Sequence, residues 1–129
     1  MGYRLGSGQT KTIIASPALA AETIVATTGP VNPAVDTALV ILFWFGELTI
    51  GTSGTSLNIK IRRGATLTDT LVNVGQARTV VAGNLVSFSG WTFDTPGAVA
   101  EVQYSLTAQV GAGAAASTFT DVALIAIAL

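Results

Sequence analysis

The sequence predicts an all-β fold of antiparallel strands, and three observations carry this prediction. Short runs rich in Val, Ile, Leu, Thr and Phe recur along the 129 residues, and such side chains pack well on a pleated surface. Gly and Pro interrupt these runs about every 8–12 residues, a spacing typical of turns between strands. No helical stretch is long enough for the crossover that parallel strands need.

Period-two alternation identifies individual strands. In residues 56–63, Leu57, Ile59 and Ile61 share one face and polar side chains share the other. Residues 100–110 alternate in the same way. One apolar face in such a run is typical of a half-solvated antiparallel strand. Residues 84–93 also alternate, but they carry large apolar side chains on both sides, so we expect less water around them.

The remaining elements follow from local signals. Ser16-Pro17 is a helix-start signal that predicts at most one turn, and residues 23–28 return to a strand-like composition. Gly46, Gly75 and Gly83 are among the expected breaks, and residues 112–116 are expected to form a loop of small side chains. The total is about eight strands, the number in an antiparallel jelly-roll sandwich of two sheets.

Composition narrows the function. Only 10% of the residues are charged, against roughly 25% in an ordinary soluble domain, whereas 50% are hydrophobic. With no Cys and no His, the chain has no disulfide, thiolate metal site, thiol nucleophile or imidazole base. The net charge of −1 gives no long-range attraction to nucleic acid. We therefore expect a structural building block and neither an enzyme nor a cofactor-binding protein.

Two strands are apolar on both faces, residues 39–45 and 122–129. Both are far shorter than the ~20 residues of a membrane-spanning helix, so no membrane partner is expected. In a sandwich only one face of a strand meets the core, and something else must cover the second face. A loop or the N-terminal segment could do so, but the low charge favours another subunit. The predicted subunit-interface residues are Leu39, Ile41, Phe43, Trp44, Phe45, Leu124, Ile125, Ile127 and Leu129.

Residues 1–12 are predicted to be a flexible N-terminal arm, and residues 13–129 the jelly-roll domain. The arm is rich in Gly and small polar side chains, which cannot build a core, and it lacks the apolar segment of a signal peptide. We expect it to order on contact with a partner. Its large side chains, Tyr3, Arg4 and Leu5, are the predicted docking residues, because an arm needs such groups to bind at all.

Ligand motifs are weak in this chain. Residues 6–12 lack the second glycine of a phosphate-binding loop. The basic cluster of Lys60, Arg62 and Arg63 is best explained as a solvated strand face, with contact to an acidic partner as the alternative. The seven carboxylates are scattered, and a Ser-His-acid triad is impossible without His. Trp91 with Asp94 is a possible ligand face, which would make the chain a carbohydrate-binding module of β-sandwich fold.

Four segments carry a resemblance to a known class of proteins. They are Leu57-Asn58-Ile59-Lys60-Ile61-Arg62-Arg63-Gly64, Ala82-Gly83-Asn84, Asp94-Thr95-Pro96-Gly97 and Val102-Gln103-Tyr104-Ser105-Leu106-Thr107-Ala108-Gln109. With these, residues 49–129 resemble small jelly-roll structural proteins of tailed bacteriophages, of the decoration or head-fibre type. The resemblance implies a virion component, a homotrimer attached to the major capsid protein or to another virion protein.

Overall fold

The computed structural model describes residues 19, 21–33, 39–51, 54–97, 101–111 and 117–128. These residues form seven strands: β1 (Thr23–Thr27), β2 (Val40–Thr49), β3 (Ser56–Arg63), β4 (Thr70–Thr79), β5 (Leu85–Asp94), β6 (Tyr104–Gly111) and β7 (Thr118–Ala128). The predicted all-β antiparallel sandwich is confirmed, with seven strands in place of the expected eight.

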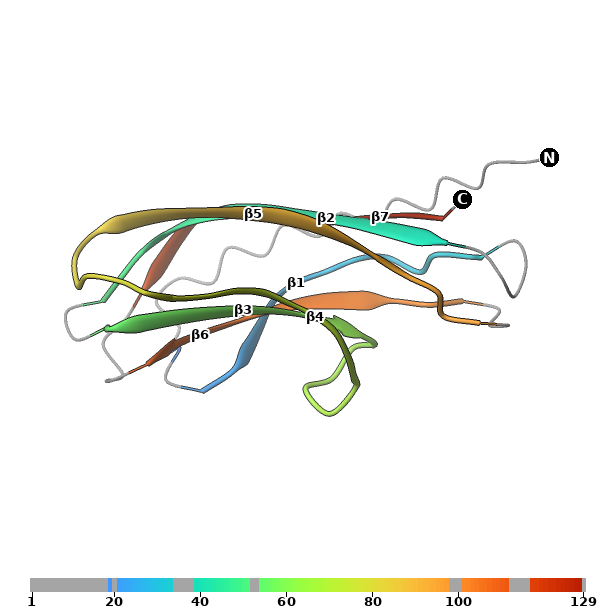
Figure 1. Ribbon diagram of the computed structural model, residues 1–129, viewed down its shortest axis with the longest axis horizontal. Coiled ribbons are helices and arrows are strands. Elements are labelled where there is room, and N and C mark those ends of the chain that lie inside the picture. The colour runs from blue at the N-terminus through green and yellow to red at the C-terminus, as the bar shows by residue number, and fades with distance from the viewer. Residues whose placement is uncertain are drawn as a thin grey trace.

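The strands form two antiparallel sheets that pack face to face (Figure 1). One sheet has the order β1-β6-β3-β4 and the other β5-β2-β7. At the two sides of the sandwich β4 lies beside β5, and β1 lies beside β7. Every strand pair is antiparallel, as the half-polar alternation of the sequence requires.

Two glycines that were expected to be breaks lie inside strands instead, Gly46 in β2 and Gly75 in β4. Gly75 is the extra residue of a β-bulge, where the register with β3 shifts between Ile59 and Lys60. A Cβ atom on Gly75 would lie 2.9 Å from the ring of Trp44. The glycine therefore permits close packing on an indole, which a sequence pattern cannot distinguish from a turn.

The break expected at Gly83 is confirmed. Gly83 has a φ of +80°, a conformation that favours glycine, and it lies in the turn between β4 and β5. Its N–H donates to the carbonyl of Ile50, and the N–H of Asn84 donates to the carbonyl of Val81. The first bond ties the turn to the residue that follows β2, and the second lies within the turn itself.

The core lies between the sheets and is built from the inward-facing side chains of the strands. The largest fully buried ones are Tyr104, Phe119, Leu19, Leu42, Leu48, Ile50, Leu57, Ile59, Ile61, Leu106, Leu124 and Val25. The alternation predicted for residues 56–63 is confirmed by the inward positions of Leu57, Ile59 and Ile61. Leu106 of β6 is also inward, but Ser105 and Thr107 on the opposite face are buried as well, so the half-solvated strand expected for residues 100–110 is wrong. In the β5-β2-β7 sheet, Phe88 of β5 and Phe119 of β7 pack edge to face, with ring centroids 6.3 Å apart.

Residues 1–18, which contain the predicted arm and most of the expected helical turn, lie outside the described residues. Among the residues that the structure describes, no helix is both long and apolar enough to cross a membrane.

Candidate functional site

The outer face of the β5-β2-β7 sheet carries three successive rows of side chains that are apolar at every position except Ser89. Because β2 is the central strand, each row is one residue of β2 with its partners on either side. The rows are Phe93–Ile41–Ile127, Trp91–Phe43–Ile125 and Ser89–Phe45–Ala123. Beyond them the face becomes polar, with the row Ser87–Glu47–Asp121. We call the first three rows the apolar face.

Four aromatic rings of the apolar face are exposed to solvent. Trp91 is 66% exposed, Phe93 57%, and Phe43 and Phe45 42% each. At about 150–250 Å² for a whole aromatic side chain, these fractions correspond to on the order of 400 Å² of exposed aromatic surface. A monomeric protein rarely exposes more than a few hundred Å² of contiguous apolar surface, and larger patches mark interaction sites.

The apolar face contains five of the predicted subunit-interface residues, and it brings together side chains from separate parts of the chain. Ile41, Phe43 and Phe45 come from β2, and Ile125 and Ile127 from β7. Leu39 precedes β2 and is half-buried, and Leu129 lies outside the described residues. Sequence reasoning missed the contribution of β5, and the expectation of less water around residues 84–93 is wrong for Trp91 and Phe93, which are exposed.

Trp44 and Leu124 are corrections to the predicted interface. They pair with each other across β2 and β7, but both point into the core, where Trp44 is 3% exposed and Leu124 0%. Side chains alternate along a strand, so Trp44 cannot share a face with Phe43 and Phe45. Neither residue is available to a partner.

The predicted ligand face of Trp91 and Asp94 is also corrected. The two residues are three positions apart on β5, and an odd spacing places them on opposite faces of the sheet. Trp91 points outward, whereas Asp94 is only 8% exposed and faces the second sheet. The structure does not bring them together, so they cannot bind one ligand.

Asp94 instead connects the two sheets. It accepts hydrogen bonds from Nε of Arg63 on β3 at 2.7 Å and from the hydroxyl of Tyr104 on β6 at 2.8 Å. Burial raises the pKa of Asp94, but the hydrogen bonds from Arg63 and Tyr104 outweigh it and hold the pKa below its ordinary value. Burial and the bond to Asp94 raise the pKa of Tyr104. This group is structural.

The basic cluster is likewise satisfied within the chain. Lys60 and Arg62 share the outer face of β3, and both bind Glu22, at 3.2 Å from Lys60 Nζ and 2.6 Å from Arg62 Nε. Arg63, on the other face, binds Asp94. Both explanations that the sequence offered, a solvated strand face and a contact to an external acidic partner, are therefore wrong. The acidic partners come from the chain itself: Glu22 precedes β1, and Asp94 lies in β5.

The Glu22 cluster makes folding stability depend on pH. The hydrogen bond from Arg62, opposed by burial and assisted by Lys60, lowers the pKa of Glu22 from 4.5 to about 2. The contribution of Glu22 is therefore complete above about pH 4.5 and is lost as the pH falls through 2. We expect Glu22→Gln to reduce the loss of unfolding free energy between pH 5 and pH 2, measured by denaturant titration. Glu101→Gln, which removes an exposed carboxylate, is the control, and identical pH profiles for the two variants would contradict the prediction.

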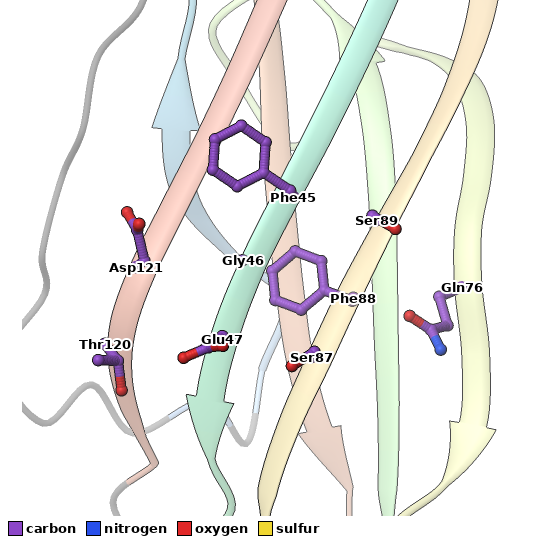
Figure 2. A pocket seen from close by; sticks show the side chains of 9 residues that line it. All are labelled: Phe45, Gly46, Glu47, Gln76, Ser87, Phe88, Ser89, Thr120 and Asp121. Atoms are coloured by element: carbon purple, nitrogen blue, oxygen red, sulfur yellow. The ribbon is translucent and has the colours of Figure 1, made fainter.

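A hollow of about 640 Å³ adjoins the apolar face at its polar end (Figure 2). Its lining combines one exposed aromatic ring with carboxylates, hydroxyls and an amide. Gly46 and Phe88 lie at its centre, and Gln76 lies beyond β5, on β4 (Figure 2). The other lining residues are Phe45, Glu47, Ser87, Ser89, Thr120 and Asp121.

A β-bulge in β7 shapes one side of this hollow. The register between β2 and β7 shifts after Glu47, which pairs with Asp121, so that Thr120 has no partner on β2. Such an extra residue redirects the side chains around it, and here both Thr120 and Asp121 line the hollow. A Cβ on Gly46 would lie 2.4 Å from the ring of Phe88, so glycine is required at the centre. Neither feature has a signal in the sequence pattern beyond the glycine itself.

The described residues contain no group of three or more His, Cys, Asp or Glu side chains that could hold a metal ion. Tyr3, Arg4 and Leu5, the predicted docking residues, lie outside the described part of the chain.

Comparison with known proteins supports the fold. No family model matches the chain, and no curated protein matches it. Among solved structures, a chain of infectious bursal disease virus, Gx strain, is similar with a TM-score of 0.51 and 12% identity, covering 98% of this chain and 31% of that one. A mutant VP2 protein of the same virus, in derived T=1 particles, is similar with the same TM-score and identity, covering 98% of this chain and 32% of that one.

The protein has a jelly-roll β-sandwich fold. The chain spans about a third of the length of the viral chains that it matches, and at this identity the likeness concerns the fold alone. A CBM22-1 xylan-binding domain from Paenibacillus barcinonensis is also similar, with 11% identity and coverage of 92% of this chain and 97% of that one. Its TM-score of 0.42 is below the similarity that establishes a common fold.

Proposed function

We propose that the protein is a structural subunit of a virus particle that assembles with copies of itself through the apolar face. The observation that carries this proposal is the continuity of Ile41 and Phe43 with aromatic residues of β5 and isoleucines of β7, in two adjoining rows that Phe45 extends. A folded chain that leaves four aromatic rings on one flat sheet face needs a cover for them.

The size of the apolar face suits a second copy of this chain. Two copies in contact would bury on the order of 800 Å² of aromatic surface, or about 20 kcal/mol at 25 cal/mol per Å². This exceeds the roughly 4–15 kcal/mol that association costs in lost translational and rotational freedom. With the isoleucines and the rim, the contact approaches the 1,200–2,000 Å² of a standard interface.

The charge distribution also supports a protein partner of the same kind. None of the nine residues in the three rows is charged. The centre of a stable subunit interface is depleted of charge and enriched in aromatic residues. Such a face can be buried against neighbouring copies around a symmetry axis without burying a charge in the contact.

Solution mass tests the assembly. We expect the protein to sediment as an oligomer at tens of micromolar, a trimer if it follows the resembled phage proteins. Phe43→Lys places a charge in the middle row and is expected to yield monomers that keep their fold, because Phe43 is already half-exposed. Val81→Lys, at a 63% exposed apolar side chain in the β4–β5 turn, is the matched control and should leave the oligomer intact. A monomeric parent protein, or a Phe43→Lys variant of unchanged mass, would contradict the proposal.

The location in a virion is supported by the resemblance to phage structural proteins and by the fold likeness to a protein of T=1 particles. A decoration or fibre subunit would bind the major capsid protein, or another virion protein, through residues 1–12, with Tyr3, Arg4 and Leu5 as anchors. Removing residues 1–12 is expected to abolish co-sedimentation with particles while the oligomer persists. Undiminished co-sedimentation of the shortened protein would show that the arm does not dock.

A further inference from the structure

The indole of Trp91 carries a hydrogen-bond donor on a face that offers it almost no acceptor. Trp91 is 66% exposed, and its Nε1–H donates to none of the residues that the structure describes. The three rows of the apolar face contain one polar side chain, Ser89. A second copy that covers this face removes the N–H from water, and a buried donor without an acceptor is destabilising. A stable contact between copies therefore has to bring an acceptor to Trp91.

The hollow at the polar end of the same face contains such an acceptor in Glu47. Its side chain is half-buried, and it makes no hydrogen bond or ion pair with another described residue. Neighbouring groups are already in use. Arg78 donates to the backbone carbonyl of Ser87 at 3.1 Å and, in the amide orientation that satisfies both side chains, to the oxygen of Gln76 at 3.1 Å. Asp121 also has an interaction of its own. Glu47 is thus the carboxylate of the hollow that is left to accept from a partner.

The apolar part of the hollow suits an aromatic ring. Phe45, which is 42% exposed, lines the hollow and also belongs to the apolar face (Figure 2). The volume of about 640 Å³ lies within the 300–1,000 Å³ of pockets that hold whole small molecules, so it admits an indole. Of the aromatic side chains that the structure describes, Trp91 alone is both exposed and equipped with a polar hydrogen, because Trp44 and Tyr104 are buried. An exposed ring beside an unpartnered acceptor therefore matches Trp91.

We propose that Trp91 of one copy inserts into the hollow of a neighbouring copy, where its ring packs on Phe45 and its N–H donates to Glu47. The proposal rests on the assembly of copies through the apolar face, and it names the residues that align them. The contact cannot form within one chain. Trp91 pairs with Phe43, four residues before Glu47 on β2, so the two side chains start about 13 Å apart at about 3.3 Å per residue. A second copy whose Trp91 lies above the row of Glu47 brings them together.

A single polar contact of this kind decides how two copies align. Rows of similar apolar side chains can pack in more than one register, because the hydrophobic effect is not directional. A hydrogen bond that is satisfied in one register alone separates that register from the others, as a buried polar residue does in coiled coils. Tryptophan is also among the residue types that contribute most to binding at interfaces. Trp91 and the hollow lie on the same face, so every copy of a closed assembly can use both.

Sedimentation equilibrium of a double-mutant cycle tests the proposal. Trp91→Phe keeps a ring and removes the N–H, whereas Glu47→Ala removes the acceptor. We expect each change to raise the dissociation constant of the oligomer at least about tenfold. The double variant should be hardly weaker than Trp91→Phe alone, because the two residues act through one bond. Phe93→Leu is the matched control, since Phe93 lies on the same strand and face but outside the hollow, and its effect should multiply with that of Glu47→Ala.

The fluorescence of Trp91 provides a second measurement on the unaltered protein. The chain has two tryptophans, and Trp44 is buried in each copy, so a change of emission with protein concentration reports on Trp91. We expect the emission to shift to shorter wavelength as the parent protein assembles, because the indole leaves water. The Trp91→Phe variant should show no such shift.

Three outcomes would overturn the insertion of Trp91 and leave the apolar face as the contact between copies. They are an oligomer that Trp91→Phe does not weaken, independent effects of Trp91→Phe and Glu47→Ala in the cycle, and an emission of Trp91 that does not move on assembly. A monomeric parent protein would overturn the contact through the apolar face as well. Thermal unfolding of each variant verifies that the fold persists, as expected for side chains on the outer face of the sheet.

Discussion

Asp94→Ala is expected to lower the free energy of unfolding by about 3 kcal/mol, and to do so without disturbing the outer face of the sheet. The carboxylate joins the end of β5 to Arg63 and Tyr104 on the opposite sheet. Its removal leaves the fully buried hydroxyl of Tyr104 without its acceptor and the guanidinium of Arg63 without its counter-charge. Unsatisfied buried polar groups cost more than the bonds contribute.

Denaturant titration of Asp94→Ala and Asp94→Asn at pH 7 measures this effect. Asn keeps one acceptor oxygen and removes the charge, so its loss of stability should be intermediate. Glu101→Ala, which removes an exposed carboxylate, should change the unfolding free energy by less than about 0.5 kcal/mol. An Asp94→Ala variant as stable as the control would show that the connection between the sheets contributes nothing to folding.

The stability that Asp94 contributes has a definite pH dependence. Because its folded pKa lies below its ordinary value, the contribution is present above the unfolded pKa and is lost as the pH falls through the folded one. The difference in stability between the parent protein and Asp94→Ala should therefore shrink on acidification.

Gly90→Ala is expected to destabilise the protein by roughly 1–3 kcal/mol although it adds only one methyl group. A Cβ at this position would lie 2.4 Å from Cζ2 of Trp44, which is a buried and rigid ring. Gly75 of β4 also approaches the indole without a side chain, and a Cβ there would lie 2.9 Å from Cζ2 of the ring. The buried ring has little room to move, so an added methyl group forces either the strand or the ring out of its best position.

A double-mutant cycle tests this explanation of Gly90→Ala. Trp44→Leu shortens the side chain that a new Cβ would meet, so Gly90→Ala should cost markedly less in the Trp44→Leu background than in the parent protein. Ser89→Ala, one residue earlier and on the outward face, is the matched control and should have little effect. Equal costs in both backgrounds would show that the indole is not the cause.

Strand identity and side-chain direction are local properties, and they were predictable here from particular residues. Leu57, Ile59 and Ile61 are inward because they alternate with polar neighbours, as expected. The same rule, applied strictly, separates Trp44 from Phe43 and Asp94 from Trp91. Both errors in the predicted sites came from grouping residues by composition and not by their parity along the strand.

The candidate sites themselves depend on long-range pairing. Nothing near Phe43 in the sequence shows that Trp91 and Ile125 lie on either side of it, because that depends on the register of three strands. Likewise the hollow requires the bulge at Thr120 to face Glu47, and bulges leave no period in the sequence.

By itself, the sequence determined that this protein is a two-sheet β structure with too little charge and too many apolar side chains to cover every strand. The alternation of apolar and polar side chains and the residue composition are properties of each strand by itself, so they can be recognised without knowing the fold. Only the tertiary structure decided that the surplus lies on one continuous face of β5-β2-β7. It also decided that glycines such as Gly75 and Gly90 accommodate Trp44 inside strands, because these features arise between segments that meet only after folding.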